Sequence, residues 1–199
     1  MSNYFSPPAL APEDRATFQS WGWWMQAQRR FSPGEHAIVE QAADFAEELV
    51  SNHFKMSSGQ WLRHQYDIVT AKDMAPHEVV EGPYAQVIKY EARVKTKELG
   101  SAAYDYYKVC LQDAAILSIM DQNADLKLYP FLLYVITHEL VHVVRFGRFL
   151  QIYEKTSEKK DAMQEERVVH RMTDEILIRV NVNGMKTVLH YYGQWRTAE

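Results

Sequence analysis

Residues 131–144 read FLLYVITHELVHVV and decide the fold of this chain. The stretch is almost wholly apolar and helical in pattern, so we expect a buried, rigid helix, which the surrounding periodicity extends over about residues 128–153. His138 and His142 are four residues apart and therefore lie on one face of that helix, one turn from each other. Glu139 lies about 100° round the helix axis, beside the same face.

This H-E-x-x-H pattern is typical of a catalytic zinc site. Two neutral imidazoles at this spacing can bind a single Zn²⁺, and a carboxylate beside them can accept a proton from metal-bound water. Zinc lowers the pKa of that water to roughly 7, which makes hydroxide available at neutral pH. The pattern therefore predicts His138 and His142 as metal ligands and Glu139 as a catalytic general base.

A catalytic zinc ion takes three protein ligands and a water molecule, so a third ligand must come from elsewhere. The next predicted helix, over about residues 161–180, carries Glu165, Glu166 and His170. Glu166, His170 and Asp174 recur at every fourth residue and form a polar stripe, which we expect to face the two histidines. Plain solvent exposure of the stripe is the alternative. The spacing leaves the third ligand open among Glu165, Glu166 and His170.

The chain at this point resembles the zincin metallopeptidases, and in particular the gluzincins, over about residues 84–178. In that branch a glutamate on a helix downstream of H-E-x-x-H completes the zinc site, and Glu166 follows His142 by 24 residues. The metzincin variant is disfavoured, because Arg145 and Arg148 stand where it needs glycine and histidine.

The resemblance implies a mechanism and a cofactor. Zn²⁺ bound by His138, His142 and Glu166 would activate water against a peptide bond, with Glu139 as the base and then the proton shuttle. Gluzincins often carry a second acidic residue where this chain has His170. His170 is therefore a candidate catalytic residue, and its role as support, ligand or transition-state donor is open.

The resemblance also implies a group that stabilises the oxyanion and a strand that pairs with substrate. Besides His170, the candidates for the oxyanion are three residues of the C-terminal element, which could fold back over the site: His190, Tyr191 and Tyr192. A strand between Tyr104 and Met120 is the candidate edge for an extended peptide.

The remaining pattern predicts an α+β fold with N-terminal helices, a small antiparallel β-sheet, the H-E-x-x-H helix and a following ligand-bearing helix. Ser32 is a predicted N-cap for a helix that begins at Pro33 and ends near Phe54. Ile88 to Lys95 alternates apolar and charged residues, which indicates a strand with one wet face, and Tyr104 to Leu111 returns as its antiparallel partner. Two further segments are weaker strand candidates, the second equally compatible with a helical turn: 61–70 and 114–120.

The chain is expected to form a single zincin-like domain over residues 1–199, because no clean boundary divides it. A helix is plausible over residues 13–31, and its three tryptophans, Trp21, Trp23 and Trp24, are more typical of packing against a core than of a partner surface. The expected regions are a loose lead-in (1–12), a mainly helical part (13–80), the sheet with the metal-binding helices (81–180) and a C-terminal element (181–199).

Composition narrows the class of protein. The 199 residues are 47% apolar with a formal net charge of −4, which argues for a globular fold and against nucleic acid as a partner. A single cysteine, Cys110, allows no internal disulfide. With neither a signal peptide nor a membrane span in view, we expect a cytoplasmic protein that acts on a peptide or protein. The sequence sets no oligomeric state.

Two other functions fit the same residues. One is a binding or regulatory protein with a zincin fold and a metal site but no proteolysis. The other is a non-haem di-iron protein, because Glu139 and His142 also form an E-x-x-H pair. The di-iron alternative needs a second such pair, and no other histidine of the chain has a glutamate three residues before it.

Overall fold

The computed structural model describes residues 29–57, 65–93, 103–148 and 159–193. These residues form an α+β fold with five α-helices and one three-stranded mixed sheet. The predicted helix over residues 13–31, apart from its end, and the tryptophan cluster lie outside the described residues. In chain order the elements are α2 (Pro33–Phe54), β1 (Gln65–Val69), the 3₁₀ helix η2 (Pro76–Glu78), β2 (Ala85–Arg93), β3 (Ala103–Leu111), α4 (Asp113–Gln122), α5 (Leu128–Gly147), α6 (Lys159–Leu177) and α7 (Met185–Gly193).

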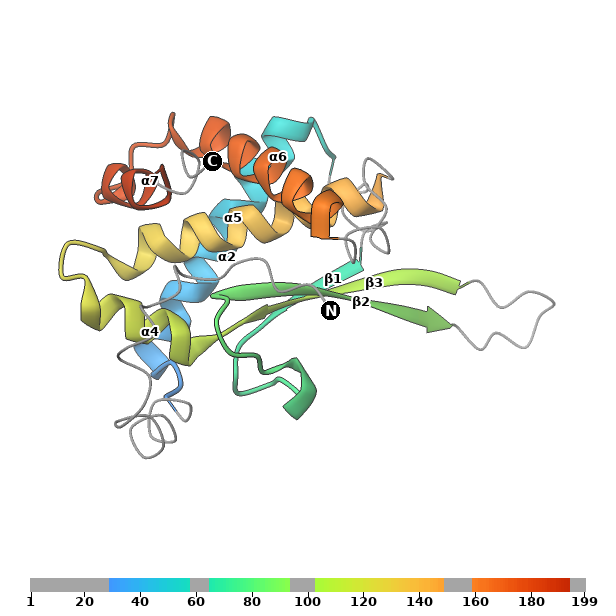
Figure 1. The fold of residues 1–199 in the computed structure, drawn as a ribbon, viewed down its shortest axis with the longest axis horizontal. Helices are drawn as coiled ribbons and strands as arrows, with labels where there is room; N and C mark the ends of the chain where they lie inside the picture. Colours follow the sequence, from blue (N-terminus) through green and yellow to red (C-terminus); the bar gives the residue numbers. More distant parts are fainter. Residues whose placement is uncertain (1–28, 58–64, 94–102, 149–158, 194–199) are drawn as a thin grey trace.

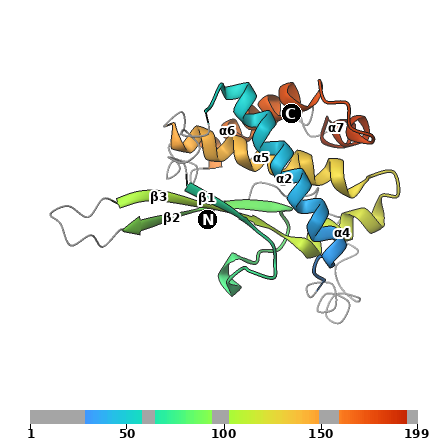
Figure 2. The ribbon, with the colours of Figure 1, turned by 180° about the vertical axis from the view of Figure 1, so that it is seen from behind.

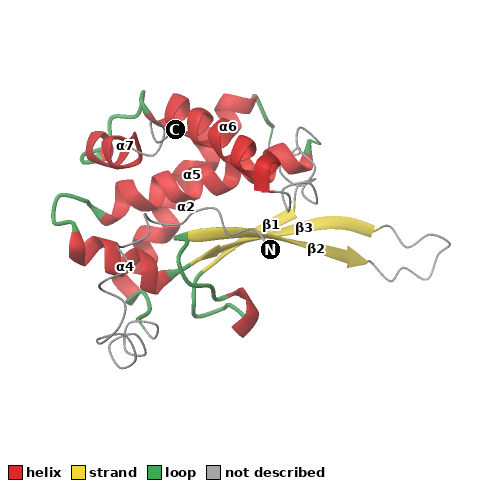
Figure 3. Cartoon of the chain, viewed as in Figure 1, coloured by secondary structure: helices red, strands yellow, loops and turns green. Residues whose placement is uncertain are grey.

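The elements form layers with α5 in the middle (Figure 1). The sheet lies on one side of α5, and α6 and α7 lie on the other. Figure 2 shows α2 crossing α5 from behind, so that α5 has neighbours on several sides. In Figure 3 the five α-helices lie on one side of the sheet or at its end, whereas η2 lies below the opposite face. The central helix is thus enclosed, which is the position that its sequence predicts.

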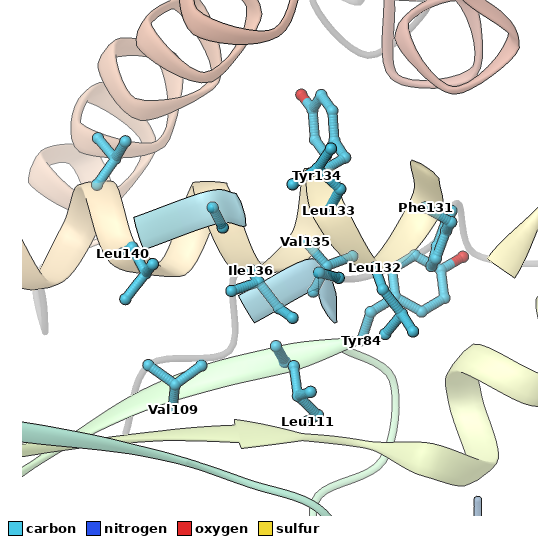
Figure 4. Close-up of a cluster of buried hydrophobic side chains, with 14 of the residues drawn as sticks. Tyr84, Val109, Leu111, Phe131, Leu132, Leu133, Tyr134, Val135, Ile136 and Leu140 are labelled. Carbon is cyan, nitrogen blue, oxygen red and sulfur yellow. The ribbon is translucent and has the colours of Figure 1, made fainter. Parts of the chain in front are cut away.

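The enclosure of α5 is complete over most of its length, since every residue from Pro130 to Phe146 is buried. Figure 4 shows Leu132 and Ile136 directed at the sheet, where Val109 and Leu111 meet them. Tyr134 points the opposite way, toward the layer of α6 and α7. A helix covered on both sides is apolar nearly all round, and each polar group in it needs a buried partner. Long as α5 is, no helix in the described part of the chain combines the length and apolarity of a membrane span.

The start of α2 is confirmed at the predicted residue. Ser32 is the N-cap, and its side chain accepts a hydrogen bond from the backbone N–H of Glu35 while the Glu35 carboxylate accepts one from the Ser32 N–H. This reciprocal pair satisfies two of the backbone donors that a helix start leaves unpaired. Pro33 occupies the first turn, where its missing N–H has no consequence.

The prediction of an antiparallel sheet is wrong for one of its strands. β2 and β3 are antiparallel as expected, but β1 pairs in parallel with β3, and the order is β1-β3-β2. The weak strand candidate over 61–70 is thus β1, and β3 occupies the centre of the sheet. The predicted role of the segment between Tyr104 and Met120 as a free edge is therefore also wrong. Alternation reveals a strand but not a partner distant in sequence, which is why the pairing was missed.

The alternation in β2 predicts that its charged side faces solvent and its apolar side faces the helices, and the structure reverses these two sides. Val87 lies opposite Val109 and faces the helices, so Ile88 lies opposite Lys108 on the far face of the sheet. That face is partly covered by Glu78 of η2, whose carboxylate bonds Lys108 and the hydroxyl of Tyr90. The apolar side of the alternating pattern thus lies away from the helices.

The segment over 114–120, a strand candidate, belongs to helix α4. Asp113 in its first turn is completely buried and connects two distant parts of the chain. One of its carboxylate oxygens accepts the N–H of Phe31 and the other accepts the N–H of Ala71, both at 2.9 Å. A carboxylate at a helix N-terminus is also stabilised by the helix dipole.

We expect the isosteric change Asp113→Asn to lower the free energy of unfolding by about 1–2 kcal/mol, because the amide nitrogen would face a backbone donor in a buried site. Urea unfolding followed by circular dichroism measures the effect. The matched change at the exposed Asp125, Asp125→Asn, should stay within about 0.5 kcal/mol. Equal stability of the two variants would contradict the role given to Asp113.

Candidate metal centre

The candidate site lies between α5 and α6, which face each other with polar stripes. On α5 the stripe is Tyr134, His138 and His142, each four residues from the next. On α6 Glu166 and His170 oppose it: His142 lies against Glu166, and Tyr134 lies against His170. The two helices therefore run in opposite directions across the site. The sequence left open whether the polar residues of α6 face solvent or the histidines. In the structure Glu166 and His170 face the α5 stripe that holds the histidines.

Two imidazole nitrogens and the two carboxylate oxygens of Glu166 lie close together. The Nε2 atoms of His138 and His142 are 3.2 Å apart, and the Glu166 carboxylate oxygens lie 3.3 Å from the first and 3.2 Å from the second. A tetrahedral zinc ion with bonds of 2.0–2.1 Å holds its ligand atoms about 3.3–3.4 Å apart. The two imidazole nitrogens and the Glu166 carboxylate thus lie close enough together to bind one small cation, with two nitrogen ligands and a carboxylate ligand.

Glu139 is 3% exposed and lies in the same buried environment. Burial raises the pKa of its carboxyl to about 8, an effect that His142 opposes and Glu166 reinforces. A group with a pKa near neutrality suits proton transfer. A cation bound at these ligand atoms would lower the pKa of Glu139 again and favour its base form.

The ligand groups shift one another's pKa. Burial lowers the pKa of His138, which is 1% exposed, although Glu166 opposes the shift. Burial would lower the pKa of His142 too, but the carboxylates of Glu166, Glu139 and Glu165 outweigh it and raise the pKa. For Glu166 burial favours the neutral form, yet the two imidazoles lower its pKa. The ionised carboxylate of Glu166 thus lies between two histidines, and a cation bound there would interact favourably with its negative charge.

Glu165 lies one residue before Glu166 but engages a different partner. Its two oxygens accept hydrogen bonds of 2.6 and 2.7 Å from Nε and an Nη atom of Arg145. Both side chains are buried, Glu165 at 3% exposure and Arg145 at 9%. A rotation of about 100° per residue separates the two glutamates round α6, so one carboxylate meets the histidines and its neighbour meets the arginine.

His170 lies against His138 and next to the ligand atoms of His138 and Glu166. The two rings are 4.5 Å apart between centroids, and Nδ1 of His170 is 3.0 Å from the hydroxyl of Tyr134. Within the described ranges, His138, Glu166 and His170 also form a cluster whose ligand atoms all lie within 4.8 Å of one another. His170 is therefore close enough to bind a metal ion or to donate a hydrogen bond beside it.

The other oxyanion candidates lie on α7 and differ in position. Tyr192 is buried and stacks flat on Tyr134, with ring centroids 4.0 Å apart and planes inclined by 4°. The Tyr191 hydroxyl lies 2.9 Å from that of Tyr84, and His190 is exposed. Tyr192 thus supports the Tyr134–His170 pair from behind, while His190 stays in solvent.

Sequence reasoning missed two residues of the site, Tyr134 and Arg145. The signal for Tyr134 was present, since it precedes His138 by four residues and so shares its helix face. Arg145 follows His142 by three residues, the other spacing that places side chains on one face. A buried arginine needs a carboxylate partner, and the adjacent pair Glu165 and Glu166 supplies one for Arg145 and one for the histidines.

The donor set fits a divalent cation of the first transition series. Imidazole nitrogen and carboxylate oxygen suit several of these ions, and a three-ligand site leaves a position for water. The buried Nδ1 of His142 has no hydrogen-bond partner among the described residues, and it would need an acceptor if Nε2 bound an ion. The site could therefore hold one cation beside a carboxylate able to move a proton.

No known protein family, no curated protein and no solved structure matches this chain at a significant level.

Proposed function

We propose that this protein is a zinc-dependent hydrolase of the gluzincin type that cleaves peptide bonds. The observation that carries the proposal is that the Nε2 atoms of His138 and His142 lie 3.2 Å apart and 3.2–3.3 Å from the two carboxylate oxygens of Glu166, with Glu139 buried beside them. The H-E-x-x-H spacing and the downstream glutamate support the zincin resemblance. The sheet beside α5 argues against the di-iron alternative, because di-iron sites of this kind are built in helical bundles.

In the proposed reaction each residue has one task. His138, His142 and Glu166 hold the zinc ion, which when bound supplies Lewis acidity and lowers the pKa of water. Glu139 takes a proton from the attacking water and passes it to the leaving amine. His170, fixed by Tyr134, donates a hydrogen bond to the oxygen of the scissile carbonyl as negative charge develops there. The enclosure by α5, α6 and α7 keeps the dielectric low, which strengthens these interactions.

A second candidate is a metal-binding regulatory protein without hydrolysis. It is favoured by the proximity of His170, because a fourth protein ligand would leave no position for water. The two candidates differ in the response of the cobalt-substituted protein to acetohydroxamate. A change in the visible spectrum indicates an open position and supports the hydrolase, whereas an unchanged spectrum supports the closed site.

The proposal requires that the purified protein bind zinc. We expect elemental analysis to find one zinc ion per chain after loading and dialysis, and His142→Ala to lose at least about 100-fold in zinc affinity, because two ligands hold zinc poorly. His53→Ala removes an exposed imidazole on α2 and should leave zinc binding unchanged. A wild-type protein that cannot be loaded with zinc would overturn the proposed function.

A further inference from the structure

We infer that Glu165 is a positioning residue for His142: held by Arg145, its carboxylate accepts the Nδ1–H of His142 when Nε2 binds a metal ion. The inference rests on the metal site of the proposed function and assigns Glu165 a place outside the ligand set. It also gives a reason for the arginine one turn after the second histidine.

The first argument is that the Glu165 carboxylate already has a hydrogen-bonded partner, Arg145. Its two oxygens each accept a hydrogen bond from the guanidinium of Arg145, at 2.6 and 2.7 Å, in the bidentate geometry that is strongest for this pair of groups. Turning the carboxylate toward the ligand atoms would break both bonds and leave a buried arginine unpaired, which is costly. Glu166, which already lies within 3.3 Å of both imidazoles, is the carboxylate free to act as ligand.

The second argument comes from the two nitrogens of His142. Nε2 lies 3.2 Å from both His138 Nε2 and a Glu166 oxygen, so this nitrogen is the one that faces the other candidate ligands. Nδ1 is buried, has no hydrogen-bond partner among the described residues, and lies 3.9 Å from Oε1 of Glu165. A histidine that binds a metal through Nε2 carries its proton on Nδ1, and that N–H needs an acceptor.

The third argument is that little movement is needed. A hydrogen bond of about 2.9 Å between Nδ1 and Oε1 requires an approach of about 1 Å, within the reach of a small ring rotation. Oε1 accepts one bond from Arg145 and retains a lone pair for a second. Because Glu165 and Glu166 are adjacent on α6, one turn of helix would supply both the ligand and the acceptor that orients a neighbouring ligand.

The test compares zinc affinity, measured by competition with a chelator, in three variants. Glu165→Gln should still bind one ion but 10–100-fold more weakly, because glutamine is uncharged and offers one acceptor oxygen to the N–H groups of Arg145 and His142 where the carboxylate offers two. Arg145→Met keeps the Glu165 carboxylate as an acceptor but removes the group that holds it, so it should weaken zinc binding by less than Glu165→Gln does. The control Glu175→Gln, an exposed glutamate of the same helix, should bind as wild type. Circular dichroism establishes that each variant folds.

A second measurement uses the unmodified protein. In the zinc-loaded, ¹⁵N-labelled chain, the imidazole of His142 should show an Nδ1–H proton that is protected from solvent exchange and shifted downfield by the carboxylate. This readout reports the hydrogen bond directly and stays available if Arg145→Met does not fold.

Each outcome separates the inference from the proposed function. A wild-type chain that binds no zinc removes the function and the inference together. If wild type binds zinc and Glu165→Gln binds equally well, the inference alone is wrong. Equal weakening in Glu165→Gln and Arg145→Met indicates a clamp between helices and no action on His142, and complete loss of the ion in Glu165→Gln indicates a ligand. Either of these results also overturns the inference.

Discussion

Glu139→Gln is expected to lower turnover by about 10²–10⁴-fold while one zinc ion per chain is retained. The amide keeps the size of the side chain but cannot accept a proton from water, and none of the candidate ligand atoms belongs to Glu139. Turnover is measured with a library of fluorogenic peptides, and zinc by elemental analysis of the same samples. Glu40→Gln, at an exposed position of α2, should behave as wild type in both.

The same variant should be more stable than wild type when zinc is absent. Burial raises the pKa of Glu139 from 4.5 to about 8, so the folded metal-free chain binds an extra proton between these values and loses stability as the pH rises. Glutamine has no such dependence. We expect Glu139→Gln to exceed wild type by about 3–5 kcal/mol at pH 8 and to match it near pH 4. A stable variant with unchanged turnover would show that Glu139 is not the general base.

The second large effect concerns Glu78, which is 1% exposed beneath the sheet. Its carboxylate accepts hydrogen bonds from Lys108 at 2.8 and 2.9 Å, from the Tyr90 hydroxyl and from the Ala75 N–H. Although burial favours the neutral acid, these partners together lower the pKa of Glu78 from 4.5 to about 2. The ionised form therefore stabilises η2 against the sheet.

We expect Glu78→Gln to lower the free energy of unfolding by about 3 kcal/mol at pH 7, the value that corresponds to this pKa difference. Because the folded pKa is depressed, the stabilisation is complete above about pH 5 and is lost as the pH falls toward 2. The gap between wild type and variant should shrink to roughly half at pH 3. Urea unfolding at both pH values measures the gap.

The exposed Glu81 on the same loop provides the control, since Glu81→Gln should change stability little at either pH. A gap for Glu78→Gln that stays constant between pH 7 and pH 3 would contradict the pKa assigned to Glu78. In that case the loss would come from packing of the side chain and not from its charge.

The elements that local patterns determine could be predicted from the sequence. The cap at Ser32, the enclosed helix α5 and the antiparallel pair β2–β3 depend on neighbours a few residues away, and all three are found. The parallel position of β1 could not be predicted, because it depends on a partner about 40 residues further along the chain. The prediction of which β2 face meets the helices failed for a related reason, since η2 covers the apolar side of the pattern and that side was expected to face the helices.

Within the candidate site, the sequence placed His138, His142 and Glu139 by helical spacing alone. It could not choose among Glu165, Glu166 and His170, because the rotation of α6 relative to α5 is a property of packing. The structure brings Glu166 to both imidazoles and Glu165 to Arg145. Because the arginine occupies Glu165, Glu166 is the glutamate that lies against the ligand nitrogens. The identity of the metal and the reaction stay predictions for the experiments above.

The complete burial of α5 has a consequence for how the site opens. The amides of an enclosed helix exchange with solvent only when the whole domain unfolds, whereas a helix with one exposed face can detach at lower cost. α6 is of the second kind, with Arg167, Arg171 and Glu175 in solvent. The two imidazoles thus belong to the helix that unfolds last, whereas Glu166 moves away from them when α6 detaches. Partial unfolding would release the carboxylate and keep the histidine pair, so the lifetime of the complete site is set by the docking of α6.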